Sequence, residues 1–230
     1  MGAVQLIALL ATLFIGGHFV LSSVPVRAAM VGAIGERLFR GLYSLIALAT
    51  FIPLVVVFAR HKHAGAMLWN LRTVAPVRWL VWLMMLAAIV IFVASFITPN
   101  PATIGVPAGD GTPRGILKLT RHPAFVAFSL FGFAHMLMNG WIGDIAFFAT
   151  FPLLGLVGAW HQDRRKLREG GERYCRFFDQ TSLMPGVALL SGRQRLSAGD
   201  FPWLTTAIGI AAFLALVALH HRLFGGYPLG

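Results

Sequence analysis

The chain has 230 residues, of which 57% are hydrophobic and only 12% are charged, and its mean hydropathy is +0.76. Soluble domains carry about one quarter charged residues, so this composition indicates a membrane protein and excludes an ordinary soluble enzyme. The single cysteine, Cys175, excludes an internal disulfide framework or a cysteine-cluster metal site. The net charge of +11 arises in the loops between apolar runs, where it would orient a membrane protein, so we predict no nucleic-acid partner.

Six stretches approach the roughly 20 apolar residues that a helix needs to cross the hydrocarbon core of a bilayer. They lie at roughly 3–22, 39–59, 78–98, 121–139, 141–161 and 202–221. We therefore predict an all-α, integral membrane helical bundle with about six transmembrane helices, forming a single domain over residues 1–230. We expect the first stretch to be a retained span and not a signal peptide, because no lysine or arginine precedes Arg27.

The basic residues predict how the bundle is oriented. With six spans, fourteen lysines and arginines fall on one side of the membrane and five on the other. The positive-inside rule then places both termini outside and the long 162–201 loop in the cytoplasm. Within this loop, residues 163–179 are charged and carry Tyr174, Phe177 and Phe178. We expect either a helix on the membrane surface with these rings in the lipid, or a solvated helix next to the membrane.

Ionisable residues inside a span are costly and are therefore candidates for function. His18, His135, Asp144 and His161 qualify. Glycine lies beside both His18 and His135, and phenylalanine and methionine surround His135. A pocket of this kind suits a large apolar macrocycle, and neutral imidazole is a common ligand of haem iron. The alternative is that each histidine only forms a hydrogen bond to a neighbouring helix.

A third histidine, His122, precedes the fourth span in the sequence Arg121-His122-Pro123. His122 and His135 are about 20 Å apart along one helix, so they cannot bind the same metal and any partner must come from another span. His18 and His135 differ in expected depth by about 14 Å, and His122 is therefore kept as a reserve ligand. Arg121 is expected either to pair with haem propionates or to extend towards the lipid headgroups.

Five segments together resemble the NnrU family of bacterial membrane proteins, which also includes the plant 15-cis-zeta-carotene isomerases. They are GGHFVLSSVPVR (16–27), GERLFRGLYSLIAL (35–48), GAMLWN (65–70), GILKLTRHPAFVAFSLFGFAHMLMNG (115–140) and GAWHQDRRKL (158–167). The resemblance implies a haem b protein of the bacterial cytoplasmic membrane with His18 and His135 as the axial iron ligands. It also implies a role in nitrite and nitric oxide metabolism during denitrification, with nitric oxide as a partner.

The same resemblance offers a second function, the haem-dependent isomerisation of a lipid-soluble polyene. The plant isomerases have a cysteine three residues before the second histidine, where this chain has Gly132. Thiolate ligation at that position is therefore excluded, and the sequence favours haem binding over isomerase activity. No catalytic residue can be named.

A weaker similarity links RHPAF (121–125) and REGGERYCRFFDQTSLMPG (168–186) to the isoprenylcysteine carboxyl methyltransferases. In those enzymes the matching segments hold S-adenosylmethionine, but here Phe125 replaces a tyrosine and the paired glutamates are missing. We interpret this similarity as a shared scaffold without a shared cofactor.

Overall fold

The computed structural model describes residues 1–103 and 109–226, and over these it is helical. The long helices are α1 (Ala3–Ser22), α2 (Val24–Arg60), α3 (Ala75–Ile97), α4 (Pro123–Met138), α6 (Thr150–Glu169) and α9 (Trp203–Phe224). The shorter ones are η1 (Gly115–Lys118), α5 (Ile142–Phe148), α7 (Gly171–Gln180), α8 (Val187–Leu190) and η2 (Ala198–Asp200). The predicted all-α architecture is confirmed.

Five segments are long and apolar enough to cross a membrane: α1, α2, α3, the α5–α6 segment and α9. The predicted fourth span corresponds to α4, which is apolar but has only 16 residues. Together these helices define a multi-pass membrane protein. The predicted spans at 3–22 and 39–59 leave a loop between them, and this is wrong, because α2 starts at Val24 and continues through a kink at Gly35, where φ is 79°. The left-handed backbone at this position favours glycine.

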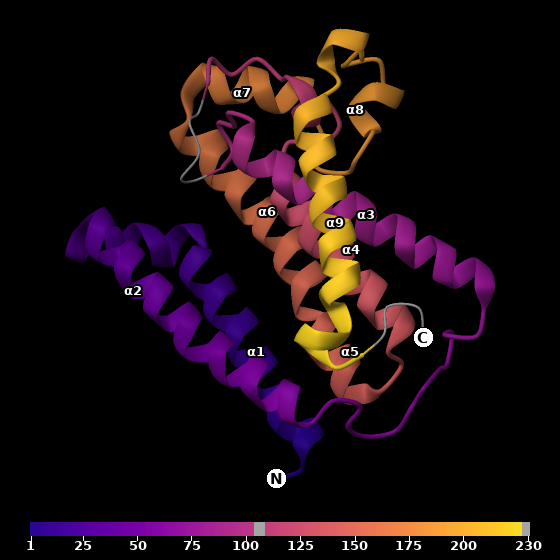
Figure 1. Cartoon of the computed structure of the whole chain (residues 1–230). Coiled ribbons are helices and arrows are strands. Elements are labelled where there is room, and N and C mark those ends of the chain that lie inside the picture. Colours follow the sequence, from indigo (N-terminus) through magenta and orange to yellow (C-terminus); the bar gives the residue numbers. More distant parts are fainter. Residues whose placement is uncertain (104–108, 227–230) are drawn as a thin grey trace.

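The helices alternate in direction, as the predicted spans require. Figure 1 shows α1 and α2 side by side as a hairpin along one flank, with α3, α4, α6 and α9 forming the rest of the bundle. The start of α1, the end of α2 and the end of α9 lie at one end. Helices α7 and α8 lie at the other end, together with the kink of α2, and we call this the α7 end. The α7 end therefore carries the side of the chain that is richer in basic residues.

Helices α4 and α6 approach each other at two glycines. A Cβ added to Gly132 would lie 2.4 Å from Cδ of Pro152 and 2.6 Å from the carbonyl oxygen of Phe148. A Cβ on Gly155 would lie 2.3 Å from Oγ of Ser129. In membranes, small residues allow backbones to pack closely where the hydrophobic effect does not drive helix association. These two contacts fix the position of α4, and hence of His135, against α6.

Gly132→Ala should destabilise the protein because the new methyl group meets the backbone and a proline ring, neither of which can rotate away. Overpacking of this kind costs about 1–3 kcal/mol. Gly41→Ala is the matched control, because Gly41 is exposed in α2 and a Cβ there meets nothing within 4 Å. Thermal unfolding in detergent should show a lower midpoint for Gly132→Ala only. Equal midpoints for the two variants would contradict the close approach.

Candidate functional site

His18 and His135 share one local arrangement although they lie on different helices. Nδ1 of His18 lies 2.8 Å from the carbonyl oxygen of Phe14, and Nδ1 of His135 lies 2.8 Å from that of Phe131. A carbonyl oxygen only accepts, so Nδ1 carries the hydrogen in both rings and Nε2 has a free lone pair in the neutral imidazole. Within the described chain neither Nε2 has a hydrogen-bond partner, and neither Nε2 atom is completely buried.

Aromatic side chains surround both imidazoles. The ring of His18 lies edge-on to Phe14 and to Tyr43 of α2, with centroid distances of 4.4 and 5.3 Å. The ring of His135 stacks on Phe148 of α5 at 4.6 Å and contacts Phe131 at 4.1 Å. Phe14 and Phe148 belong to one buried apolar cluster, and Phe131 packs against it. The two histidines therefore border the same cluster.

The two histidines occupy different levels of the bundle. Ser22 at the end of α1 bonds to His161 of α6 at 2.9 Å, whereas His135 stacks on Phe148. His18 lies four residues before Ser22. Because α1 and α6 run in the same direction, His18 is about level with residue 157 of α6. Residue 157 lies nine residues after Phe148, roughly 14 Å along the helix axis. The expected difference in depth therefore agrees with the structure, which shows no direct contact between the two side chains among its described interactions.

Arg121 and His122 lie in a buried ion cluster that centres on Asp163 of α6. Nε and Nη2 of Arg121 donate to Oδ2 of Asp163 at 2.9 and 2.6 Å, and Nε2 of His122 donates to Oδ1 at 2.6 Å. The hydroxyl of Tyr174 in α7 donates to the same Oδ1 at 2.8 Å. Arg121, His122, Asp163 and Tyr174 are all buried. We call these four residues the Asp163 cluster.

The surroundings complete the hydrogen bonding of this cluster. Nη1 of Arg121 donates to the carbonyl oxygen of Thr181 at 3.3 Å, and its guanidinium lies 4.1 Å from the ring centroid of Phe178. Burial, followed by the nearby Asp163 carboxylate, raises the pKa of Tyr174 above its usual value. Its hydroxyl therefore keeps the proton that it donates throughout the physiological pH range.

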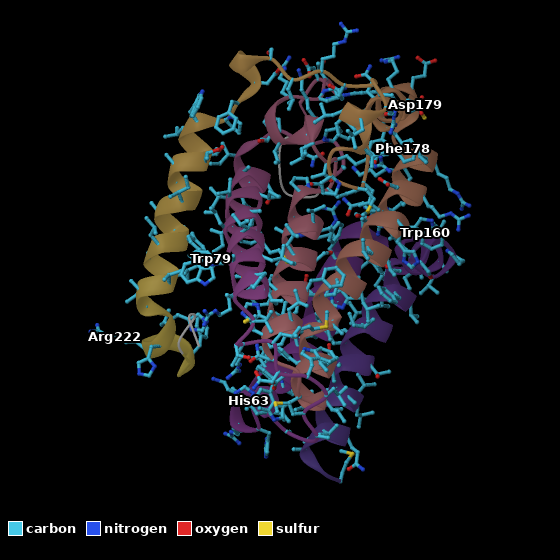
Figure 2. All side chains as sticks on the ribbon, turned by 90° about the vertical axis from the view of Figure 1, so that its right-hand side faces the viewer. His63, Trp79, Trp160, Phe178, Asp179 and Arg222 are labelled. Atoms are coloured by element: carbon cyan, nitrogen blue, oxygen red, sulfur yellow. The ribbon has the colours of Figure 1, made fainter. Side chains whose placement is uncertain are left out.

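Two expectations from the sequence are wrong at this site. Arg121 neither extends to the headgroups nor is free to pair with a propionate, because its charge is neutralised inside the protein. The aromatic residues of 163–179 do not lie in lipid, because Tyr174 and Phe177 belong to a buried core cluster and Phe178 packs against that cluster. Figure 2 shows Phe178 and Asp179 at the far end of the molecule from His63. Helix α7 is thus a cover over the Asp163 cluster.

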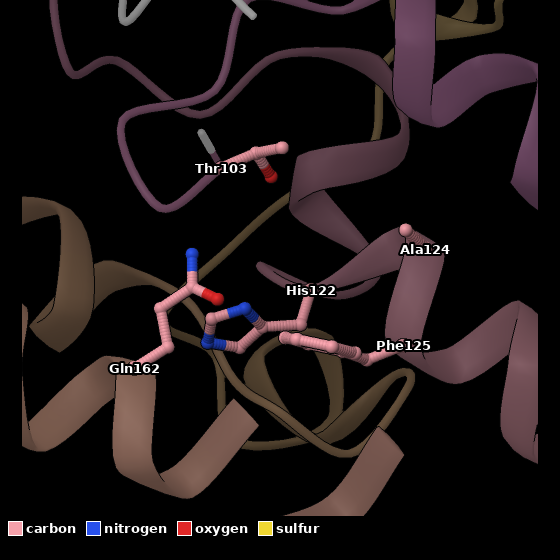
Figure 3. Close-up of a pocket in the computed structure, with 5 residues that line it drawn as sticks. All are labelled: Thr103, His122, Ala124, Phe125 and Gln162. Carbon is pink, nitrogen blue, oxygen red and sulfur yellow. The ribbon is translucent and has the colours of Figure 1, made fainter. Parts of the chain in front are cut away.

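A cavity of about 210 Å³ lies beside His122. It is lined by Thr103, His122, Ala124, Phe125 and Gln162, and Figure 3 shows the imidazole between the Gln162 amide and the Phe125 ring. Gln162 itself donates to the carbonyl oxygen of Ala102. Because Nε2 of His122 is held by Asp163, only Nδ1 remains for a ligand.

The remaining candidates have partners within the protein. Asp144 is buried in the first turn of α5 and accepts from the backbone nitrogen of His63 at 2.9 Å and from its Nδ1 at 2.6 Å. Asp144 thus joins the start of α5 to the segment that follows α2. His161 bonds to Ser22, as described above, and so joins α1 to α6.

Sequence reasoning missed the central role of Asp163. The available signal was a single carboxylate directly before three basic residues, Arg164, Arg165 and Lys166, at the end of an apolar run. Such a carboxylate is positioned to attract a cation from another helix. Its partners, 41 and 42 residues earlier, are visible only in the folded chain.

No group of three or more His, Cys, Asp or Glu side chains could hold a metal ion within the described residues. Two axial histidines on a porphyrin iron need no such group, because the macrocycle supplies four ligands. His18 and His135 meet the requirement for ligand nitrogens: each has an accessible Nε2, and each imidazole is oriented by a bond from Nδ1–H to a backbone carbonyl, the usual support for a metal-binding histidine. Because their levels differ by about 14 Å, one iron would bind both only if α1 and α4 shift along their axes.

The fold and these polar groups define a multi-pass helical membrane protein with histidines placed within the bundle. The chain belongs to the NnrU family, because the family described as NnrU protein matches residues 5–228. It is similar to the chloroplastic 15-cis-zeta-carotene isomerase of Zea mays, with 32% identity over 167 residues, which cover 71% of this chain and 45% of the relative. The corresponding protein of Arabidopsis thaliana is 32% identical over 193 residues, covering 79% and 52%.

The chain thus spans about half the length of the curated relatives that it matches. No solved structure matches it. The names of these relatives support the isomerase alternative better than the role in denitrification that we expected first. The space around Gly132 is also informative, because it leaves no room for a cysteine side chain without movement of Pro152 or Phe148.

Asp163→Ala should destabilise the protein strongly, because it leaves the buried guanidinium of Arg121 without its counter-charge. Breaking a buried ion pair by removing one partner costs about 3–5 kcal/mol. Asp179→Ala is the control, since Asp179 is exposed at the end of α7 and its side chain forms no ion pair within the described structure. The measurement is thermal unfolding in detergent. Similar midpoints for both variants would show that the cluster does not support the fold.

Proposed function

We propose that the protein is a haem-dependent membrane isomerase that converts a cis double bond of a lipid-soluble polyene to the trans form. The observation that carries this proposal is the matched geometry of His18 and His135, which leaves both Nε2 atoms free inside a membrane protein. The relatives named 15-cis-zeta-carotene isomerase support the choice of reaction.

In this proposal, histidines hold the haem and phenylalanines form the apolar wall of the substrate site. His18 and His135 would hold the haem iron through Nε2, and the carbonyl oxygens of Phe14 and Phe131 keep the two rings in the tautomer that this requires. A bound haem b would supply a redox-active iron. Such an iron can reduce the double-bond character of a conjugated bond, so that the bond rotates without net oxidation of the substrate. The aromatic rings of Phe131 and Phe148 provide an apolar wall that excludes water and suits a hydrocarbon chain.

The substrate class follows from the surroundings of the histidines. Both border an apolar cluster that consists of side chains such as Phe14, Leu54 and Phe147. The Asp163 cluster lies in a different core, at the α7 end. A polyene has no polar group to pair, so it needs burial in an apolar site and no hydrogen-bonding partner. The region around His18 and His135 meets this requirement better than the polar cavity beside His122.

The haem proposal predicts a visible spectrum. Protein purified after haem-replete expression should show the Soret band of six-coordinate, low-spin haem b, because both axial positions are occupied by imidazole. His18→Ala and His135→Ala should each lose the low-spin band. His61→Ala should retain it, because His61 is exposed and shares only the bond from Nδ1 to a carbonyl oxygen four residues earlier. Absorption and magnetic circular dichroism spectra test this. A colourless wild-type protein would refute the haem proposal.

The isomerase proposal needs a separate assay. Reconstituted protein should convert 15-cis-zeta-carotene to the product with a trans bond at that position, followed by chromatography of the pigments. His135→Ala should lower the rate at least about 100-fold, because loss of even a hydrogen-bonding partner of a metal ligand costs about 10–100-fold. Haem-loaded protein with no conversion above that of free haem in the same detergent would contradict the reaction while leaving haem binding intact.

A further inference from the structure

A second pocket, of about 310 Å³, lies at the α7 end between the two parts of α2 and the end of α6. Its charged lining consists of Arg27, Arg40, Arg165, Lys166, Glu36 and Glu169. Four cations thus face two anions. We call this the basic pocket, and it is separate from the Asp163 cluster, with which it shares no residue.

The kink of α2 creates the basic pocket. Gly35 turns the chain so that the first part of α2, with Arg27, and the second part, with Arg40, contribute to one pocket. The hydrogen bond between Ser22 and His161 fixes the end of α1 against α6 close by. Helix α6 then brings Arg165 to the same place.

Glu36 neutralises only one side of this pocket. Its carboxylate accepts from Nη2 of Arg27 at 2.7 and 2.8 Å and from Nε of Arg40 at 2.7 Å. Both of its oxygens are therefore engaged by α2 itself. Glu36 therefore acts on Arg165 only from a distance, without forming an ion pair with it in the described structure.

Arg165 and Lys166 are the unpaired cations. Across the part of the chain that the structure describes, neither forms an ion pair within 4.0 Å, although Glu169 is near enough to act on their charges. Nε of Arg165 is fully buried and has no hydrogen-bond partner, the one such side-chain atom among the described residues. A buried N–H without an acceptor is unfavourable, and in native proteins it usually indicates a missing partner.

We propose that the basic pocket binds an oxyanion, a carboxylate or a phosphate, which accepts from the guanidinium of Arg165 and is supported by Lys166. The planar fork of arginine matches the two oxygens of such a group and forms strong, charge-assisted hydrogen bonds. The occupant removes the excess positive charge and gives Nε of Arg165 its acceptor.

Two molecules could supply this oxyanion at the edge of a membrane bundle: a haem propionate or the phosphate of a phospholipid headgroup. The first rests on the proposed function. Tyr43, whose ring contacts His18, lies within electrostatic reach of Arg165. Arg40 precedes Tyr43 by three residues, about 4.5 Å of helix rise, so the pocket begins about one turn from the level of His18.

The test compares Arg165→Gln with Arg164→Gln. Arg164 is exposed and its guanidinium lies 4.7 Å from the ring centroid of Trp160, on the outside of the bundle (Figure 2). In the first arm, apoprotein binds haem b or haem b dimethyl ester, which lacks the carboxylates. In the second arm, thermal unfolding is measured in nanodiscs of phosphatidylglycerol or of phosphatidylcholine.

A propionate in the basic pocket predicts that the wild-type protein and Arg164→Gln bind haem b about tenfold more tightly than the ester, the usual worth of one charge-assisted hydrogen bond. Arg165→Gln should bind the two equally. A headgroup predicts no preference between the haems, but a higher midpoint in phosphatidylglycerol for wild type and Arg164→Gln only. Either result supports an oxyanion site and identifies its source.

The proposal is overturned if Arg165→Gln and Arg164→Gln behave alike in both arms. This outcome is distinct from failure of the proposed function. A colourless protein with a phosphatidylglycerol effect that depends on Arg165 would refute the haem and keep the pocket. A haem protein in which Arg165→Gln changes nothing in either arm would keep the haem and refute the pocket.

Discussion

The carboxylate of Asp163 is the interaction on which the α7 end of the molecule depends. Four hydrogen bonds, from the side chains of Arg121, His122 and Tyr174, converge on its two oxygens. They come from the start of α4 and from α7, so one side chain of α6 joins three helices. A lone buried charge would be very costly, and the cluster is tolerable only because each partner is present and hydrogen-bonded. The geometry of α4 follows from this anchor and from the close contact at Gly132.

Most of the membrane architecture could be predicted from hydropathy, because each span must bury about 20 apolar residues in lipid. The start of α2 could not. Residues 22–38 contain charges that resemble those of a loop, but Arg27 and Glu36 neutralise each other across the kink and make a helix possible. Helix α7 was misjudged for a related reason. Its aromatic residues are suited to lipid, but packing against apolar side chains of α3, η1 and α4 buries them in protein instead.

The candidate site was predictable in part. His18 and His135 stand out because an ionisable residue in an apolar span demands an explanation. Their supporting bonds to carbonyl oxygens four residues earlier follow directly from helix geometry. The role of Asp163 was not accessible in this way, since its partners depend on how separate helices pack. The basic pocket was equally hidden, because it depends on a kink at a single glycine and on an unpaired Arg165.

The shortness of α4 has a consequence for the bilayer itself. Sixteen residues span about 24 Å, less than the roughly 30 Å of a typical hydrocarbon core. Its neighbours α3 and α6 have 23 and 20 residues, so the mismatch is local. A bilayer that meets α4 must thin, or the protein must tilt, at a cost that depends on acyl-chain length. Membrane thickness would thereby act directly on the helix that carries His135.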